Sequence, residues 1–346
     1  MTIISVKGFS QNYILWWEDE FDGNSVNTSN WSLETGDGCP SLCGWGNNEL
    51  EWYQPQNAEV NNGRLIITAK EESVGGKDYT SARMKSKSKV EFTYGKVEAR
   101  IKMPTGQGMW PAFWMLFADP VNGGWPMDGE IDIVELVGHD NDKIYGTIHY
   151  GAAWPNNKQY GGSYKLASGT FASSFHTFSV IWDSSKIRWF VDSTLYFTAD
   201  HADVFPYDWP FNKDFYILLN CAVGGDWPGS PNASTVFPQT MEVKWVRVYK
   251  KANMVSVPTI DGPDPVKVDL SSNPMGGSGR IYVESNVNRS ATIQITDING
   301  RVIFNHSVQL DSGSWHSLDM ENVTPGAYLL TLTGSDFTWT EKIIRK

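Results

Sequence analysis

Short β-strand patterns, each ended by turn residues, recur through the first two thirds of this chain and restrict its possible folds more than any other feature. Residues 65–68 are rich in β-forming side chains, and residues 97–101 alternate apolar with polar ones. Residues 176–182, the polar turn 183–185 and residues 186–191 have the pattern of a hairpin. No segment carries a long 3.6-residue apolar period. We therefore predict an all-β sandwich or barrel, built as one domain of roughly 250 residues.

The composition changes after this first domain. Residues 252–270 contain several Pro and Gly residues, which is typical of a linker. A second β pattern follows, and residues 291–304 read as a hairpin with an Asn-Gly turn. We expect a first domain at 12–251, the linker at 252–270, and a small immunoglobulin-like β-sandwich at 271–346.

The charge and composition exclude several classes of partner. The formal net charge is −11, and Lys and Arg are scattered without a basic stripe, so we expect no nucleic-acid partner. No apolar run approaches the 18 or so residues of a membrane helix, so we expect no transmembrane segment. Of the 16 tryptophans, 14 precede the linker. The aromatic excess therefore belongs to the first domain.

The N-terminus and the cysteines give information on whether the protein is exported to an oxidising compartment. Residues 1–11 resemble the end of a truncated signal peptide, with a mature-looking start at Asn12. Cys39 and Cys43 either close a small disulfide loop in an oxidising compartment or stay free, as Cys221 does in both cases.

The sharpest motif is the run EIDIVE at 130–135. On a regular strand Glu130 and Asp132 share a face, whereas Glu135 points to the opposite one. A β-bulge between Asp132 and Glu135 would bring all three acids to one side of the strand. Three neighbouring carboxylates repel one another, so this cluster costs stability and needs a functional explanation.

Two interpretations of the cluster can be compared. A solvated strand face also carries acids, but the Ile and Val residues between them and the flanking Trp and Pro disfavour it. In a glycosidase, one carboxylate attacks the anomeric carbon and one carboxylic acid protonates the leaving oxygen. Crowding of acids keeps one of them protonated near neutral pH, as the acid role requires. Asp132, between the two glutamates, can share a proton and hold the geometry of the nucleophile.

With this motif the chain resembles the family-16 glycoside hydrolases, in particular the laminarinase-type endo-β-1,3-glucanases. The resemblance runs over residues 17–249 and includes the bulged E-x-D-x-x-E spacing, where lichenases carry E-x-D-x-E. It implies a jelly-roll β-sandwich with a concave cleft and retention of anomeric configuration. It also implies that Glu130 is the nucleophile, Glu135 the acid/base and Asp132 the assisting carboxylate. In a retaining enzyme the two glutamate carboxyl groups lie roughly 5–5.5 Å apart.

The same resemblance suggests polar sugar-binding residues. The loop at 44–50 resembles the family's loop whose Asn contacts glucose, which corresponds to Asn47. The segment at 79–83 resembles the strand whose Arg reaches sugar, which corresponds to Arg83. For Arg83, an ion pair with a surface acid is the alternative.

Aromatic residues near the acids are further candidates. Trp110, Trp114 and Trp125 are close in sequence to Glu130, and a pyranose stacks its apolar C–H faces on aromatic rings. Trp110 and Trp114 share a face if they lie on one strand, and core packing is the alternative for each. Trp125, between Gly and Pro residues, favours the cleft. His149 is either a buried structural histidine or, as we prefer, a hydrogen-bond partner of Asp132 or Glu130.

A structural calcium ion is common in the family on the convex side, bound by residues corresponding to Glu20, a carbonyl near Gly63 and an Asp in the last strand. Lys244 occupies that Asp position. Calcium prefers oxygen ligands, and an ammonium group supplies none. We expect no required cofactor, with calcium as the alternative that the resemblance leaves open.

The C-terminal segment from about Ser271 resembles the sorting domains of type IX secretion in Bacteroidetes-like bacteria. The matching features are Asn273-Pro274, the Asp and Asn-Gly-Arg residues near 297–301, a Pro-Gly-Ala-Tyr run at 325–328 and the basic tail at 342–346. This implies export through the type IX secretion machinery. A small carbohydrate-binding module is the alternative, but this segment has few tryptophans.

The sequence therefore predicts a secreted or cell-surface bacterial protein, monomeric, that hydrolyses a laminarin-like β-1,3-glucan by a retaining double displacement. One alternative keeps the chemistry but acts on mixed-linkage β-1,3-1,4-glucan or an algal galactan. Another is a non-catalytic glucan-binding protein on the same scaffold, which would be expected to have lost the acids.

Overall fold

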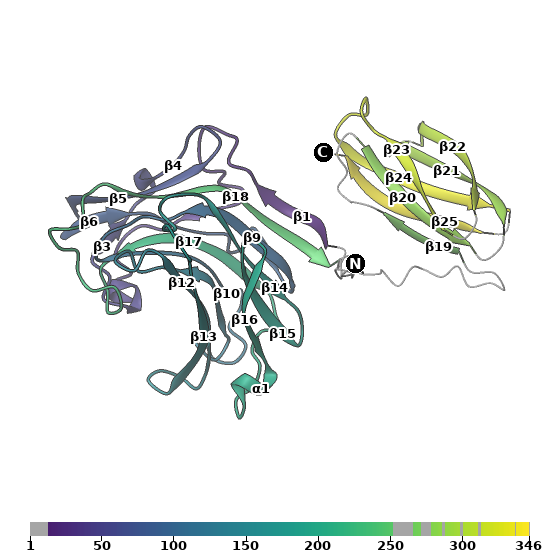
Figure 1. Cartoon of the computed structure of the whole chain (residues 1–346). Coiled ribbons are helices and arrows are strands. Elements are labelled where there is room, and N and C mark those ends of the chain that lie inside the picture. The colour runs from purple at the N-terminus through teal and green to yellow at the C-terminus, as the bar shows by residue number, and fades with distance from the viewer. Residues whose placement is uncertain are drawn as a thin grey trace, which may run out of the picture. The chain divides into compact units, whose positions relative to one another are not determined.

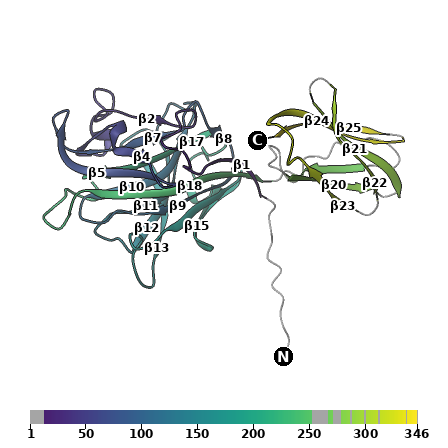
Figure 2. The same cartoon turned by 90° about the horizontal axis from the view of Figure 1, so that it is seen from above.

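The computed structural model describes residues 13–251, 266–270, 278–285, 288–297, 300–310, 313–335 and 337–345. Two compact units result: Trp17–Val248, and a second unit composed of Met1–Trp16 with Tyr249–Lys346. Figures 1 and 2 show both units as all-β structures. Among the described residues, no helix has the length and apolar character needed to cross a membrane.

The first unit is a sandwich of two large sheets, as the sequence predicted. The outer sheet contains, in spatial order, β16 (Thr194–Asp200), β15 (Lys186–Val191), β14 (His176–Trp182), β9 (Gly95–Lys102), β18 (Gln239–Lys251), β5 (Leu65–Val74), β6 (Lys77–Ser81) and β3 (Glu51–Tyr53), with β1 (Tyr13–Asp19) beside β18 and β4 (Ala58–Val60) beside β5. The inner sheet contains β13 (Asn157–Lys165), β12 (Lys143–Gly151), β11 (Glu130–Glu135), β10 (Met109–Phe117), β17 (Phe215–Val223), β7 (Arg83–Lys85) and β2 (Ser32–Leu33), with β8 (Glu91–Phe92) beside β17. Three short helices, η1 (Cys43–Gly46), η2 (Pro55–Asn57) and α1 (His201–Val204), lie in connecting segments.

The two sheets curve in the same sense, with β10, β12, β13 and β17 on the inside of the curve (Figure 1). The predicted hairpin forms from β14 and β15, which pair antiparallel. Ile187, Trp189 and Val191 alternate into the core and are at most 2% exposed. Period-two alternation thus buries one face of each sheet, and the opposite face of the inner sheet is left for the cleft.

The two sheets pack closely beneath β12. A Cβ atom built on Gly146 would lie 2.4 Å from Cδ1 of Trp189 and 2.6 Å from the hydroxyl oxygen of Tyr196. Trp189 also donates its indole N–H to the carbonyl oxygen of Asp132 at 2.8 Å. The outer sheet therefore holds the backbone of the acid-bearing strand directly.

The second unit is a smaller antiparallel sandwich. One sheet contains β19 (Val266–Leu270), β20 (Ser278–Ser285) and β23 (Ser314–Asp319); the other contains β22 (Val302–Leu310), β21 (Arg289–Asp297), β24 (Gly326–Gly334) and β25 (Thr338–Arg345). The predicted hairpin forms from β21 and β22, although Asn299 of its turn lies outside the described residues. Ile293, Leu330 and Ile343 belong to a hydrophobic core within this unit.

The predicted linker extended too far toward the C-terminus. Its last five residues form β19, which pairs antiparallel with β20, and Val266 and Val268 are buried. Alternating valines in a Pro-rich neighbourhood were the missed strand signal. The rest of the linker, the Asn273-Pro274 motif and residues 1–12 lie outside the described residues.

Candidate active site

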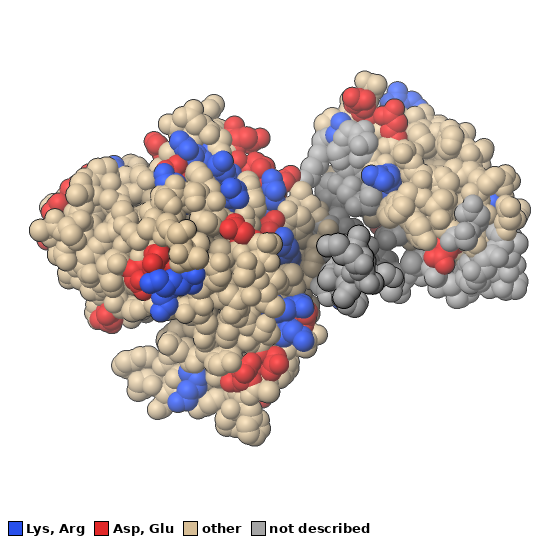
Figure 3. All heavy atoms as spheres, viewed as in Figure 1, with Lys and Arg blue, Asp and Glu red and all other residues tan. Residues whose placement is uncertain are grey.

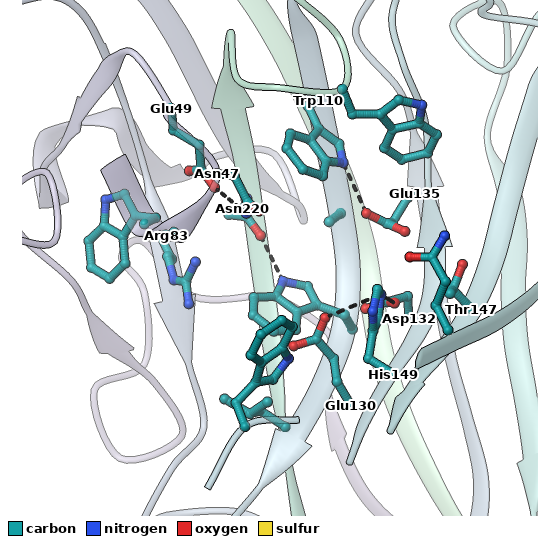
Figure 4. Close-up of a pocket in the computed structure, with 18 of the residues that line it drawn as sticks. Asn47, Glu49, Arg83, Trp110, Glu130, Asp132, Glu135, Thr147, His149 and Asn220 are labelled. Atoms are coloured by element: carbon teal, nitrogen blue, oxygen red, sulfur yellow. Dashed lines mark hydrogen bonds and ion pairs between the residues drawn. The ribbon is translucent and has the colours of Figure 1, made fainter. Parts of the chain in front are cut away.

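The inner sheet carries a cleft of about 720 Å³ that brings together all nine predicted site residues. The lining residues are Leu42, Trp45, Gly46, Asn47, Glu49, Arg83, Trp110, Ala112, Trp114, Leu116, Trp125, Glu130, Asp132, Glu135, Tyr145, Thr147, His149, Gln159, Asn220 and Trp227. Figure 4 shows the acids facing the indole and amide side chains across this space.

The predicted β-bulge is present in β11. Glu130 lies opposite His149 of β12 and Asp132 opposite Thr147, but the register then shifts so that Glu135 lies opposite Tyr145. The pairing with β10 shifts at the same place. The bulge puts Glu130, Asp132 and Glu135 on the cleft side, while the aliphatic residues between them are at most 1% exposed.

His149 joins the first two acids. Its Nε2 atom lies 3.1 Å from Oδ2 of Asp132 and 3.7 Å from Oε1 of Glu130, so the preference for an acid partner over a purely structural histidine is confirmed. Burial opposes protonation of the ring, but the hydrogen bond and charge of Asp132, together with the charges of Glu130 and Glu135, outweigh it and raise the pKa of His149 to about 10. The imidazolium partly offsets the negative charge of the cluster.

The two glutamates have raised pKa values. Burial, together with the nearby Asp132 charge, raises the pKa of Glu130 to about 7 and that of Glu135 to about 8. The charges of His149 and Arg83 limit the rise for Glu130. Because the two groups are coupled and both pKa values are raised toward neutral pH, the pair retains a proton near neutral pH, as a carboxylate together with a carboxylic acid.

Indole rings form the wall beside Glu135. Trp110 donates its N–H to Oε1 of Glu135 at 3.0 Å, and its ring meets that of Trp227 edge-on at 5.6 Å. Trp227 also contacts Tyr145 at 4.9 Å. Trp110 and Trp114 both line the cleft, as their shared face predicted. At the other end, the ring of Trp125 lies 6.2 Å from that of His149 and is 40% exposed.

Arg83 lies between two aromatic rings and keeps an acidic partner. Its guanidinium carbon is 4.5 Å from the ring centre of Trp45 and 5.0 Å from that of Trp114. Its Nε atom donates to Glu34 at 2.7 Å. The two interpretations from sequence thus coexist, because Arg83 is ion-paired and also lines the cleft.

Several lining residues were not predicted, among them Trp45, Asn220 and Trp227. Each is distant in sequence from the acids, although Trp45 lies in the loop at 44–50 that the resemblance had already indicated through Asn47. Thr147 is different, since it precedes His149 by two residues on β12 and therefore shares its face. Strand alternation alone could have identified it.

A disulfide between Cys39 and Cys43, just before Trp45 and Asn47 in the chain, settles the alternatives left open by the sequence. Cys221 is a free thiol, fully buried in β17. The backbone N–H of Asp226 donates a hydrogen bond to the carbonyl oxygen of Asn47 at 2.9 Å. This bond ties the Trp45 loop to the segment that bears Trp227.

The residues expected to bind calcium have other partners. Glu20 accepts a hydrogen bond from Nε of Arg247 at 2.6 Å. Lys244 is exposed, with its ammonium nitrogen 4.7 Å from the ring centre of Phe175. With one carboxylate ion-paired and a lysine where an Asp is expected, this donor set does not fit a calcium ion.

Charge is mixed on the face of the protein that Figure 3 shows. Figure 3 shows Lys and Arg interspersed with Asp and Glu on the face in view, with broad uncharged areas between them. Within the cleft the positive groups among the lining residues are Arg83 and His149, and each has an acidic partner.

A two-sheet β-sandwich with paired glutamates in a cleft walled by tryptophans is the architecture of a glycoside hydrolase. Comparison with known proteins agrees: residues 46–247 match the family described as "Glycosyl hydrolases family 16", and the chain belongs to this family. Residues 273–346 match the family described as "Secretion system C-terminal sorting domain". The protein is therefore secreted or displayed on the bacterial cell surface.

Relatives and solved structures resemble the first unit. The chain is 40% identical over 256 residues to glucan endo-1,3-beta-glucosidase A1 of Niallia circulans, covering 68% of this chain and 37% of that protein. It is 39% identical over 251 residues to the beta-glucanase of Rhodothermus marinus, covering 68% of this chain and 84% of that one. The crystal structure of the laminarinase catalytic domain from Thermotoga maritima matches with a TM-score of 0.66 and 42% identity, over 70% of this chain and all of that one.

Proposed function

We propose that this protein is a retaining endo-hydrolase of β-1,3-glucan, with laminarin-like polymers as substrates. The observation that carries the proposal is the bulged strand that points Glu130, Asp132 and Glu135 into a tryptophan-walled cleft. The likeness to endo-1,3-beta-glucosidases and laminarinases supports the polymer and linkage.

The proposed reaction has two steps. Glu135, as a carboxylic acid, gives its proton to the glycosidic oxygen while the Glu130 carboxylate attacks the anomeric carbon, which forms a covalent glycosyl-enzyme and releases the leaving chain. Glu135, now a carboxylate, then takes a proton from water as the water oxygen attacks the same carbon and releases Glu130. Asp132 assists by keeping Glu135 protonated, because its charge raises the pKa of that neighbour.

The cleft favours an uncharged polymer. Sulfated galactans need cationic partners, and both positive groups among the lining residues are already ion-paired. Tryptophan rings and the amides of Asn47 and Asn220 supply the stacking surfaces and hydrogen-bond partners that a neutral glucan uses. The non-catalytic alternative is disfavoured because all three acids are in place.

The central test replaces Glu130 with Gln. This change keeps the shape but removes the nucleophile, so turnover of laminarin falls at least 10²–10⁴-fold, roughly the range for losing a positioned acid–base group, while glucan binding is retained. Glu59→Gln, the same change at an exposed site on β4, is the matched control. Equal release of reducing sugar by the wild type and Glu130→Gln contradicts the assignment.

Two further assays test the finer parts of the proposal. Incubation with laminarin, curdlan, lichenan, agarose and carrageenan, followed by chromatography of the products, tests the substrate; cleavage of agarose alone would overturn the β-1,3-glucan assignment. Proton NMR of the first products tests the stereochemistry, because retention yields the β-anomer before mutarotation.

A further inference from the structure

A chain of hydrogen bonds that the hydrolytic steps do not use runs through the sugar-binding wall of the cleft. The hydroxyl group of Tyr53 donates to Oε2 of Glu49 at 2.9 Å and accepts from the amide of Asn220 at 3.1 Å. Oδ1 of Asn220 in turn accepts the indole N–H of Trp114 at 2.8 Å. Each polar group in this relay, from Glu49 through Tyr53 and Asn220 to Trp114, therefore has a defined partner.

The relay is built on buried residues. Tyr53 is fully buried, and Glu49 and Asn220 are 4% and 5% exposed. Asn220 lies on β17 opposite Ala112 of β10, two residues before Trp114, so strand alternation puts the Asn220 and Trp114 side chains on the same face. The two hydrogen bonds of the Tyr53 hydroxyl group are buried, and such bonds hold their partners strongly because they are not readily exchanged for bonds to solvent.

The carboxyl group of Glu49 also contacts a second side chain that lines the cleft. Oε1 of Glu49 accepts a hydrogen bond from the amide of Asn47 at 3.2 Å. One buried acid is thus connected directly to Asn47 and through two residues to Trp114, and Figure 4 shows Glu49, Asn47 and Asn220 on the side of the cleft opposite His149.

Orientation matters most for Trp114. Arg83 packs over its ring at 5.0 Å, and the indole N–H is its one polar group. A pyranose stacks on an indole only when the ring plane is correctly placed. A ring fixed before binding does not lose rotational freedom when the sugar arrives.

We propose that Glu49, Tyr53 and Asn220 are positioning residues that fix Trp114 and Asn47 for the bound glucan, and so set the affinity of that end of the cleft. The proposal rests on the proposed function, since it names residues that prepare the same cleft for its β-glucan substrate. Glu49, Tyr53 and Asn220 act through Trp114 and Asn47 rather than in bond cleavage.

The experiment measures binding in the Glu130→Gln protein, with a β-1,3-gluco-oligosaccharide as the probe and calorimetry as the readout. Tyr53→Phe keeps the ring but removes the hydroxyl group that joins Glu49 to Asn220. We expect the Kd to rise about tenfold, in line with the loss of a buried hydrogen bond. Tyr150→Phe is the matched control, because Tyr150 is 6% exposed and its hydroxyl donates to the carbonyl of Asp203 at 3.2 Å, outside the cleft. We expect the Kd of the Tyr150→Phe control for the oligosaccharide to stay unchanged.

A double-mutant cycle separates positioning from a general loss of stability. Trp114→Phe removes the N–H at the end of the relay, so adding Tyr53→Phe to it raises the Kd less than about twofold further. A tenfold cost of Tyr53→Phe in both backgrounds, or no cost in either, overturns the relay. If Glu130→Gln itself binds no β-1,3-glucan, the proposed function fails first, and that result is distinguishable from a failure of the relay alone.

Discussion

At the residue scale, the site consists of acids whose proton affinities are set by a few neighbours. Burial and, after it, the charge of Asp132 raise the pKa of both glutamates, His149 opposes that rise, and Trp110 donates a hydrogen bond to Glu135. In the proposed mechanism the two glutamates differ by environment rather than by intrinsic chemistry, since both carry the same carboxyl group.

The pH dependence of kcat/KM should be bell-shaped, with limbs near pH 7 and pH 8 for the coupled pair. Activity falls below the lower limb because Glu130 takes up a proton, and above the upper limb because Glu135 loses one. Trp110→Phe removes a donor that stabilises the Glu135 carboxylate, so the alkaline limb moves to higher pH. Trp227→Phe, which removes an indole not bonded to Glu135 in the structure, leaves that limb in place; a downward shift for Trp110→Phe would contradict the role of this bond.

At the element scale, the position of the cleft depends on how closely the two sheets pack beneath β12. Trp189 of β15 reaches the backbone of β11, and Gly146 leaves room for that indole and for Tyr196. The outer sheet thus supports the bulge from behind while the acids point the other way.

Gly146→Ala tests this packing. A methyl group there would lie within 3 Å of Trp189 and Tyr196, so one sheet must shift, and we expect a loss of roughly 1–3 kcal/mol in the free energy of unfolding. Chemical denaturation measures it. Gly23→Ala is the control, because its nearest new contact is an ordinary 3.7 Å; equal stability of the two variants would contradict the close packing.

The sequence predicted the local parts of this structure and missed those that depend on which strands become neighbours. The alternation of side chains along a strand would put Glu135 on the face opposite Glu130 and Asp132, and this conflict predicted the bulge that brings the three acids together. The polar turn at 183–185 located the β14–β15 hairpin. Asn220 could not be placed in the same way, because its role depends on β17 lying beside β10. Register between distant strands is set by the packing of the whole sandwich and leaves no local pattern.

The same limit explains the end of the linker. Proline and glycine residues indicated the boundary between the two domains. The five residues of β19 nevertheless form a strand, because β20 is available to pair with them. The intrinsic β-propensity of a short segment predicts a strand only weakly when its pairing partner is not known.

At the scale of the whole molecule, hydrolysis and export occupy separate units. All residues that line the cleft lie between Leu42 and Trp227, within the first unit, and each unit has a hydrophobic core of its own. Neither core needs the other to bury its apolar side chains.

A protein ending at Lys251 should therefore keep laminarin hydrolysis with kcat/KM within about twofold of the full chain, since the stacking surfaces and acids are complete without the second sandwich. Reducing-sugar release measures this. The same truncation carrying Glu130→Gln provides the inactive control, and a soluble, folded but inactive truncation would contradict the separation.

Calcium gives a second test at this scale. We propose that the protein needs no calcium, because Glu20 is paired with Arg247 and Lys244 offers no oxygen ligand. The melting temperature should be unchanged by a chelator. Lys244→Asp restores one ligand, so this variant gains stability with added calcium while Lys186→Asp, at a lysine of β15, does not; a large chelator effect on the wild type would contradict the proposal.

The buried thiol of Cys221 has a consequence for oxidative maturation. Burial in β17 raises the pKa of this thiol far above its usual range, so the folded protein presents no thiolate from it. Thiol–disulfide exchange requires a thiolate that can reach a sulfur atom. Once the inner sheet has formed, Cys221 cannot attack the Cys39–Cys43 bond, and this disulfide beside the sugar-binding wall is protected from exchange with the third cysteine of the chain.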